Sequence, residues 1–166
     1  MIAVHQAIWS NYFQVGEAAL ASGDSLTAEA MFRESLIVAS VQVLEPMHQA
    51  NSAFALARVL LPQRPQRAEA QQLMRRAVRI YATVENLDCQ IFVSCVSSLA
   101  DSYCQEDFPE RALPLLKQAV KIVSQQTGLA APYLVPLFKR MALIYSEKSY
   151  YRKADECFRR SLQLSI

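Results

Sequence analysis

AEAMFRESL at residues 28–36 and ADECFRRSL at residues 154–162 are two versions of one nine-residue segment. Both begin with alanine and an acidic residue, and both carry Phe, Arg, Ser and Leu at the same places. The segments lie 126 residues apart, and steps of 42 from the first alanine reach Ala70 and Ala112 before the second segment begins. A fixed period of this size indicates that one structural unit is repeated along the chain.

Three further columns, each a set of residues connected by steps of 42, keep their character through four copies. The large column contains Phe32, Met74, Leu116 and Phe158, the small column contains Ser35, Ala77, Ala119 and Ser161, and the aliphatic column contains Leu36, Val78, Val120 and Leu162. Within one copy these positions and the alanine follow the spacing i, i+4, i+7 and i+8, which places them on one face of an α-helix. We expect the small residue to let a neighbouring helix approach closely while the large one fills the space beside it.

A second helical face lies upstream in each copy, where a large apolar residue precedes a small one. The four pairs are Val15-Gly16, Leu56-Ala57, Leu99-Ala100 and Met141-Ala142. The second pair is one residue out of register with the other three. We expect the segment PQRPQR at residues 62–67 to absorb this slip, because proline interrupts helices and favours a turned or extended loop.

The two faces predict that each copy is a helix, a short turn and a second helix. We expect the first helices near residues 4–22, 46–61, 89–105 and 132–147, and the second helices near residues 26–41, 67–84, 110–124 and 151–165. Pro46 and Pro132 suit the first turn of a helix, where the missing N–H is tolerated, whereas Pro114 predicts a kink or a ragged start. The repeats, at approximately 4–42, 46–84, 89–125 and 132–166, account for a single domain over residues 1–166.

The composition also favours an all-α chain. Of the 166 residues, 52% are hydrophobic, 19% are charged and only three are glycine, which destabilises helices. The formal net charge of +2 argues against a protein dedicated to nucleic acid. No apolar run is long enough to span a membrane, and the opening MIAVHQAIW lacks the pattern of a signal peptide. Together with four cysteines that form no C-x-x-C pair, this predicts a cytoplasmic protein.

The repeat resembles the tetratricopeptide repeat (TPR), in which a large–small pair and then an aromatic residue or Leu occupy the first helix, and Ala, an aromatic and Ala occupy the second. The matching residues of the fourth copy are Met141, Ala142, Tyr145, Ala154, Phe158 and Ser161, and those of the third are Leu99, Ala100, Tyr103, Ala112, Leu116 and Ala119. The period of 42 is similar to that of kinesin light chain-type repeats. The resemblance implies a right-handed superhelix of four stacked helix-turn-helix repeats whose first helices line the concave side.

The resemblance also implies a partner-binding groove on the concave side. It assigns to this groove Phe13, Glu17, Leu20, Phe54, Arg58, Ser97, Asp101, Gln105, Lys139 and Glu147. TPR domains that hold chaperone C-terminal carboxylates use Lys, Asn and Arg here, and Phe13 and Glu17 stand in the first-copy positions instead. We therefore expect a peptide or helix of another protein as the partner, with Phe13 and Phe54 as apolar anchors. The alternative is that these two aromatics only pack between adjacent first helices.

Basic residues recur at the period of 42 in the second helices, as Arg33, Arg75, Lys117 and Arg159. Aligned on stacked helices they would form a basic stripe on the convex side, which could attract RNA or an acidic partner. The ordinary alternative is a solvated face in which acidic residues offset the charge, namely Glu34, Glu69 and Glu156. RNA binding therefore stands behind protein binding as an interpretation.

The apolar end of the last helix predicts a further surface. Leu162, Leu164 and Ile166 would form an uncovered edge that packs against a second copy or a partner, unless the chain is a fragment or this end frays. Catalysis finds little support, because His5 and His48 form no metal-ligand or nucleophile motif and no phosphate-binding loop occurs. We therefore expect a non-enzymatic interaction scaffold without cofactor or metal, with self-assembly as the alternative function.

Overall fold

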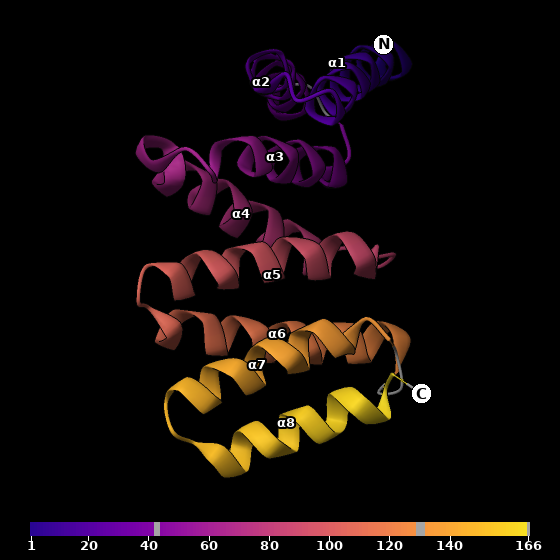
Figure 1. Cartoon of the computed structure of the whole chain (residues 1–166). Coiled ribbons are helices and arrows are strands. Elements are labelled where there is room, and N and C mark those ends of the chain that lie inside the picture. The colour runs from indigo at the N-terminus through magenta and orange to yellow at the C-terminus, as the bar shows by residue number, and fades with distance from the viewer. Residues whose placement is uncertain (42–43, 129–131, 166) are drawn as a thin grey trace. The chain divides into compact units, whose positions relative to one another are not determined.

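The described part of the chain is almost entirely helical. The computed structural model describes residues 1–41, 44–128 and 132–165. The elements formed by these residues are α1 (Ile2–Ala21), α2 (Ser25–Val41), α3 (Pro46–Leu60), the short 3₁₀ helix η1 (Arg64–Gln66), α4 (Arg67–Tyr81), α5 (Cys89–Gln105), α6 (Pro109–Thr127), α7 (Leu134–Glu147) and α8 (Tyr151–Gln163). They can be followed in Figure 1 from indigo α1 to yellow α8. The predicted all-α fold of helix-turn-helix repeats is confirmed.

Most helices begin where the sequence signals place them. Pro46 is the first residue of α3 and Pro109 is the first of α6, so neither proline leaves a helical hydrogen bond unmade. Helix α6 continues through Pro114, which lacks the N–H that would otherwise donate to the carbonyl of Glu110. The expectation for Pro132 is wrong, because α7 begins at Leu134. The Pro132 carbonyl instead accepts the N–H of Val135 at 3.1 Å in the preceding turn.

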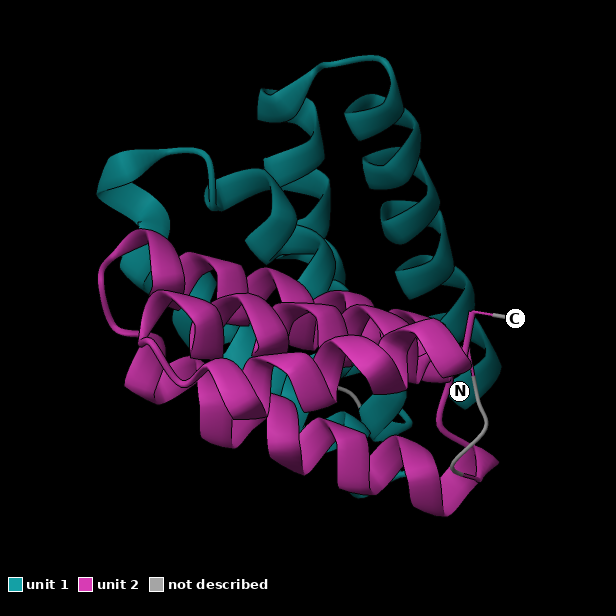
Figure 2. Ribbon diagram, turned by 60° about the horizontal axis from the view of Figure 1, so that its bottom comes forward, with its two compact units in different colours: residues 1–84 teal, residues 85–166 magenta. Residues whose placement is uncertain are grey.

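The chain divides into two compact units, Met1–Val84 and Glu85–Ile166, which Figure 2 draws in teal and magenta. In unit 1, α1 and α2 form one hairpin, α3 and α4 form a second, and α3 packs on α2 and contacts α1. In unit 2, α5 and α6 form one hairpin, α7 and α8 form a second, and α7 packs on α6 and contacts α5. Each unit is thus a pair of stacked repeats with the same order of contacts. The joining of both pairs into one four-repeat superhelix stays a prediction.

Three of the four hairpins turn in the same way. After α1, Gly23 has a φ of 82°, and the following N–H donates to the carbonyl of Ala19 at 2.9 Å. After α5 and α7, Asp107 and Ser149 each have a φ of 61° and are followed by the same hydrogen bond. This is the Schellman motif, in which a residue with left-handed backbone ends the helix. Positions 23, 107 and 149 belong to one column of the repeat.

The second hairpin turns differently because its residue in that column is Pro65. The proline ring fixes φ near −65°, so this residue cannot take the left-handed backbone that a Schellman motif requires. The chain instead passes through a turn after α3 and then the 3₁₀ helix η1, which contains Pro65. The register slip inferred from the sequence therefore coincides with a different turn.

The first hairpin closes most tightly where Gly16 of α1 meets Phe32 of α2. A Cβ atom added to Gly16 would lie 2.6 Å from Cε1 of Phe32, which is closer than side chains pack. Phe32 is fully buried. The small residue of the upstream pair therefore gives the large residue of the second helix the space that the sequence pattern predicts.

A polar contact joins three helices inside unit 1. Ser35 Oγ of α2 lies 2.9 Å from Ser52 Oγ of α3, and the indole Nε1–H of Trp9 in α1 donates to the same Ser52 oxygen at 2.8 Å. Both serines are buried, and buried hydroxyl groups usually need such partners. These bonds fix the register of α3 against the first hairpin.

Candidate functional site

The groove residues of unit 1 come from α1 and α3. Glu17 and Arg58 form an ion pair at 3.3 Å between the two helices, so the structure brings these two residues together. Both side chains are about half exposed, and an exposed pair of this kind contributes about 0–1 kcal/mol. Leu20 is half-buried near the end of α1.

The two aromatics expected as anchors lie mainly among other side chains. The Phe13 ring stacks on Trp9 at 5.0 Å between centroids and lies 5.7 Å from the Phe32 ring. Phe13 is therefore half-buried in an aromatic cluster, while Phe54 is buried and leaves little surface for a partner. Their packing favours the alternative interpretation, in which both rings belong to the core.

The groove residues of unit 2 come from α5 and α7. Arg140 donates from Nε and Nη2 to the two carboxylate oxygens of Asp101, at 2.8 Å each. Asp101 was expected at the groove from the sequence. Arg140 was missed, because the step of 42 from the groove residue Ser97 leads to its neighbour Lys139. Gln105, Lys139 and Glu147 are exposed, and none of them lines the hollow described next.

A hollow of about 550 Å³ lies between α5, α7 and the turn before α7. The residues that line it are Gln90, Val93, Ser94, Ser97, Pro132, Tyr133, Pro136 and Arg140. The lining combines an aromatic ring, two prolines and an aliphatic side chain with hydroxyl and amide groups. Sequence reasoning found only Ser97 among these residues, because the resemblance to the tetratricopeptide repeat assigned none of the others to the groove.

Ser97 is the unusual residue of this hollow. Its side chain is only 6% exposed, and its Oγ has no hydrogen-bond partner among the described residues. Leaving a buried hydroxyl unpaired costs about 1–3 kcal/mol. Ser97 thus places an unpaired polar atom just beneath the surface of the hollow.

Ion pairs offset the basic stripe on the second helices of unit 1. Arg33 of α2 contacts Glu29 at 3.0 Å within its own helix and Glu69 of α4 at 2.7 Å. The hydrogen bond from Arg33 lowers the pKa of the Glu69 carboxyl, and the bond to Glu69 raises the pKa of Arg33. This part of the stripe is thus an ion-paired surface that also links two repeats.

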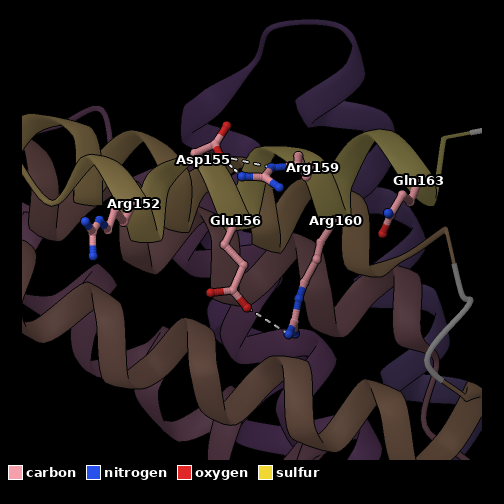
Figure 3. A pocket seen from close by; sticks show the side chains of 6 residues that line it. All are labelled: Arg152, Asp155, Glu156, Arg159, Arg160 and Gln163. Carbon is pink, nitrogen blue, oxygen red and sulfur yellow. Dashed lines mark hydrogen bonds and ion pairs between the residues drawn. The ribbon is translucent and has the colours of Figure 1, made fainter.

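The same pattern holds on α8 in unit 2, as Figure 3 shows. Arg159 pairs with Asp155, and Arg160 pairs with Glu156 at 2.9 Å. These residues line a shallow hollow of about 600 Å³, together with Arg152 and Gln163, and all six come from α8. The paired carboxylates support the interpretation of the stripe as a solvated face.

The described residues offer few groups for catalysis. Burial raises the pKa of the thiols of Cys89, Cys95, Cys104 and Cys157, which keeps them protonated and weakly nucleophilic at neutral pH. The His48 ring packs edge-on against Trp9 at 4.2 Å between centroids. Within residues 1–41, 44–128 and 132–165, no cluster of three or more His, Cys, Asp or Glu could hold a metal ion. In the same ranges, no helix has the length and apolar character needed to cross a membrane.

The predicted assembly edge is partly visible. Leu162 is 63% exposed on α8, and Leu164 is half-buried just after it. Ile166 lies outside the described residues. An exposed leucine on a helix face is available for contact with a partner, and what covers it stays a prediction.

Known structures resemble this chain although its sequence has no close match. No protein-family model matches the sequence, and no curated protein is significantly similar to it. The crystal structure of BtubC (BKLC) from P. vanneervenii aligns with 98% of this chain and 71% of its own, with a TM-score of 0.76 and 18% identity.

A second similar structure is a Podosopora anserina protein named for a kinesin light chain and its nearly identical TPR-like repeats. It aligns over 95% of this chain and 74% of its own, with a TM-score of 0.72 and 18% identity. A point variant of that protein aligns over 94% of this chain and 74% of its own, with a TM-score of 0.72 and 19% identity. The chain therefore has the fold of TPR-like helical repeats, as the resemblance of its sequence led us to expect.

Proposed function

We propose that this chain is a protein-interaction scaffold that binds an extended segment of another protein in the hollow between α5 and α7. The observation that carries the proposal is the buried, unpaired Ser97 hydroxyl in the lining of that hollow. A protein segment brings backbone N–H groups, which could donate to this hydroxyl oxygen, and C=O groups, which could accept its O–H. Folds built from stacked helical repeats are suited to such binding because they present extended surfaces.

An extended segment suits this hollow better than a helix. The backbone groups of a helix are already bonded to one another, whereas those of an extended segment are free to bond Ser97. A helix with its side chains is also about 10–12 Å across, which is wide for a hollow of about 550 Å³. We therefore choose the peptide among the partners that the sequence left open.

The lining also limits the chemistry of the segment. Tyr133 and Pro136 offer apolar surface for an apolar side chain, while Val93 beneath them is buried. The one charged side chain in the lining, Arg140, is already paired with Asp101 through two hydrogen bonds. A segment that is apolar and uncharged at this point is therefore favoured over a strongly acidic one.

A photo-crosslinking amino acid at position 94 tests the proposal. Ser94 is exposed and lines the hollow, so a crosslinker there should capture the bound segment without disturbing the core. The matched control carries the same crosslinker at Ser146, which is exposed on α7 and does not line the hollow. Because we place the protein in the cytosol, the reaction is done in native lysate under reducing conditions, and products are identified by mass spectrometry.

The expected result is one protein captured at position 94 and absent at position 146. A synthetic peptide covering its crosslinked segment should then bind the unmodified chain and lose affinity for the Ser94→Trp variant, which fills the hollow. Equal capture at both positions, or equal peptide binding by both chains, would contradict the proposal.

A further inference from the structure

Helix α1 carries an open apolar face. Its exposed residues include Val4, Ile8 and Val15, which follow the i, i+4, i+11 spacing of one helical stripe. Gly16 is the only buried residue of this twenty-residue helix. Most of α1 therefore faces away from the hairpin partner that it packs against.

The repeat shows what normally covers this face. Val15 is 42% exposed, whereas the residues that match it in α3 and α7, Leu56 and Met141, are 1% and 6% exposed. Two neighbouring positions on the same face of α1, Asn11 and Ala18, are exposed as well. The residues that match them in the other repeats are buried, namely Ser52 and Val59 in α3 and Leu137 and Ile144 in α7. Helix α3 packs on α2, and α7 packs on α6. The face is thus one that receives the second helix of another repeat.

Helix α8 carries an exposed apolar face of the kind that packs against a first helix. Phe158 and Leu162 are 39% and 63% exposed on it. Their counterparts in α2 are the fully buried Phe32 and the half-buried Leu36, and α2 is a helix that packs on the next first helix. In unit 2, Leu116 and Val120 of α6 show the same burial. The face of α8 therefore matches those that cover a first helix.

The polar residues match as well. Ser161 of α8 is buried and bonds the carbonyl of Phe158 at 2.8 Å, just as Ser35 of α2 bonds the carbonyl of Phe32 at 2.9 Å. Ser35 also lies against Ser52 of α3, and the residue of α1 that matches Ser52, once the one-residue slip of the second copy is allowed for, is Asn11. An amide at Asn11 can donate to or accept from a serine hydroxyl.

We propose that α8 of one copy of this chain packs on α1 of a second copy, in the arrangement by which α2 packs on α3. The occupant of the α1 face is then a second copy, because among the described helices α8 holds an uncovered face whose columns match the α2 and α6 contacts. The contact is head-to-tail, so it joins copies into rings or open chains and does not close a symmetric pair. This inference does not depend on the peptide-binding hollow, whose residues lie on α5, on α7 and in the turn before α7.

Two single variants and their mixture test the contact. Val15→Glu places a charge on the α1 face, and Leu162→Glu places one on the α8 face. Each should raise the dissociation constant for self-association by about tenfold or more, because an unpaired charge is costly to bury. Analytical ultracentrifugation over a wide concentration range measures this. The two variants mixed in equal amounts should form heterodimers and nothing larger, because each keeps one intact face.

Controls separate this result from misfolding. Leu26→Glu adds the same charge at an exposed residue of α2 outside both faces, so it should assemble like the original chain. Circular dichroism should show unchanged helix content in every variant. If Val15→Glu unfolds, Ile8→Glu replaces it on the α1 face, and if Leu162→Glu unfolds, Phe158→Glu replaces it on the α8 face. A chain that is monomeric at every concentration, variants that assemble normally, or a mixture that stays monomeric would each overturn the proposal.

Discussion

At the scale of single residues, one missing methyl group shapes the first hairpin. Alanine stabilises a helix by about 1 kcal/mol relative to glycine, and the other copies carry Ala57, Ala100 and Ala142 at this place. Only the first copy has glycine, at Gly16, and there the Phe32 ring occupies the space of a Cβ atom. The helix therefore gives up intrinsic stability for a closer contact.

Gly16→Ala should lower the free energy of unfolding by about 1–3 kcal/mol, because overpacking outweighs the better helix propensity. Urea unfolding followed by circular dichroism measures the change. Phe32→Leu recreates the combination of the third copy, where Ala100 stands with Leu116. The double variant should lose less stability than the sum of the single losses, and additive losses would show that the ring does not cause the effect.

The pair between Arg33 and Glu69 should make stability depend on pH. The hydrogen bond from Arg33 holds the folded-state pKa of Glu69 below its ordinary value of 4.5. Its stabilisation is therefore fully present at neutral pH and is lost as the pH falls through the folded-state pKa.

Glu69→Gln should cost about 0.2–1 kcal/mol at neutral pH, the range for a solvent-exposed pair, and less at an acidic pH below the folded-state pKa of Glu69. Urea unfolding of both chains at the two pH values measures the difference. Glu34→Gln is the control, because Glu34 is exposed on the same helix as Arg33 and forms no ion pair in the described part of the chain. A loss at Glu69 that persists in acid would show that the carboxylate charge is not its cause.

The residues of the candidate site were harder to predict than those of the core. Lys139 and Arg140 are adjacent, and only a rotation of about 100° around the helix decides which of them reaches Asp101. A period of 42 identifies residues that all copies share, and these residues build the contacts between helices. Tyr133 lies in a column that varies, so no repetition marked it, and Pro136 departs from the serine that steps of 42 reach in the other three copies, Ser10, Ser52 and Ser94.

At the scale of helices and turns, the left-handed residue after the first helix of a repeat recurs in three of the four copies. It is Gly23 in the first copy, Asp107 in the third and Ser149 in the fourth. A residue with a side chain is strained by about 1–2 kcal/mol in this backbone conformation, whereas glycine is not. Two of the three turns therefore retain strain that a substitution could remove.

Asp107→Gly and Ser149→Gly should each raise the free energy of unfolding by about 0.5–1 kcal/mol, since the relief of strain exceeds the entropy that glycine adds to the unfolded chain. Gly23→Ala is the matched reverse substitution and should lower the free energy of unfolding. No atom lies within 4 Å of its added Cβ, so any loss comes from the backbone alone. Thermal unfolding measures all three, and a stabilising Gly23→Ala would contradict the account.

Some helix ends were predictable from a proline or glycine, as the start of α3 at Pro46 and the turn at Gly23 show. Pro132 misled because a proline can stand in the turn before a helix as well as in its first turn, and both placements satisfy its fixed φ. The end of α4 at Tyr81 had no such signal, and the helix stops three residues before the position expected.

At the scale of the whole molecule, a few columns carry the fold while most of the sequence is free to differ. At 18% identity, the solved structures still align over 95% or more of this chain. In this chain, members of the alanine, large and small columns are buried between helices in every copy whose packing is complete, as Ala28, Phe32 and Ser35 are. The residues between them decide what binds, and similarity of fold carries no information about them.

The order of helix contacts has a consequence for how the chain folds. Within each unit, the main contacts join helices that are neighbours or next neighbours in sequence. Chains dominated by such local contacts pay little loop-closure entropy before they gain packing energy, so they fold quickly. The two hairpins of each unit can therefore pack on each other without waiting for a distant part of the chain to fold.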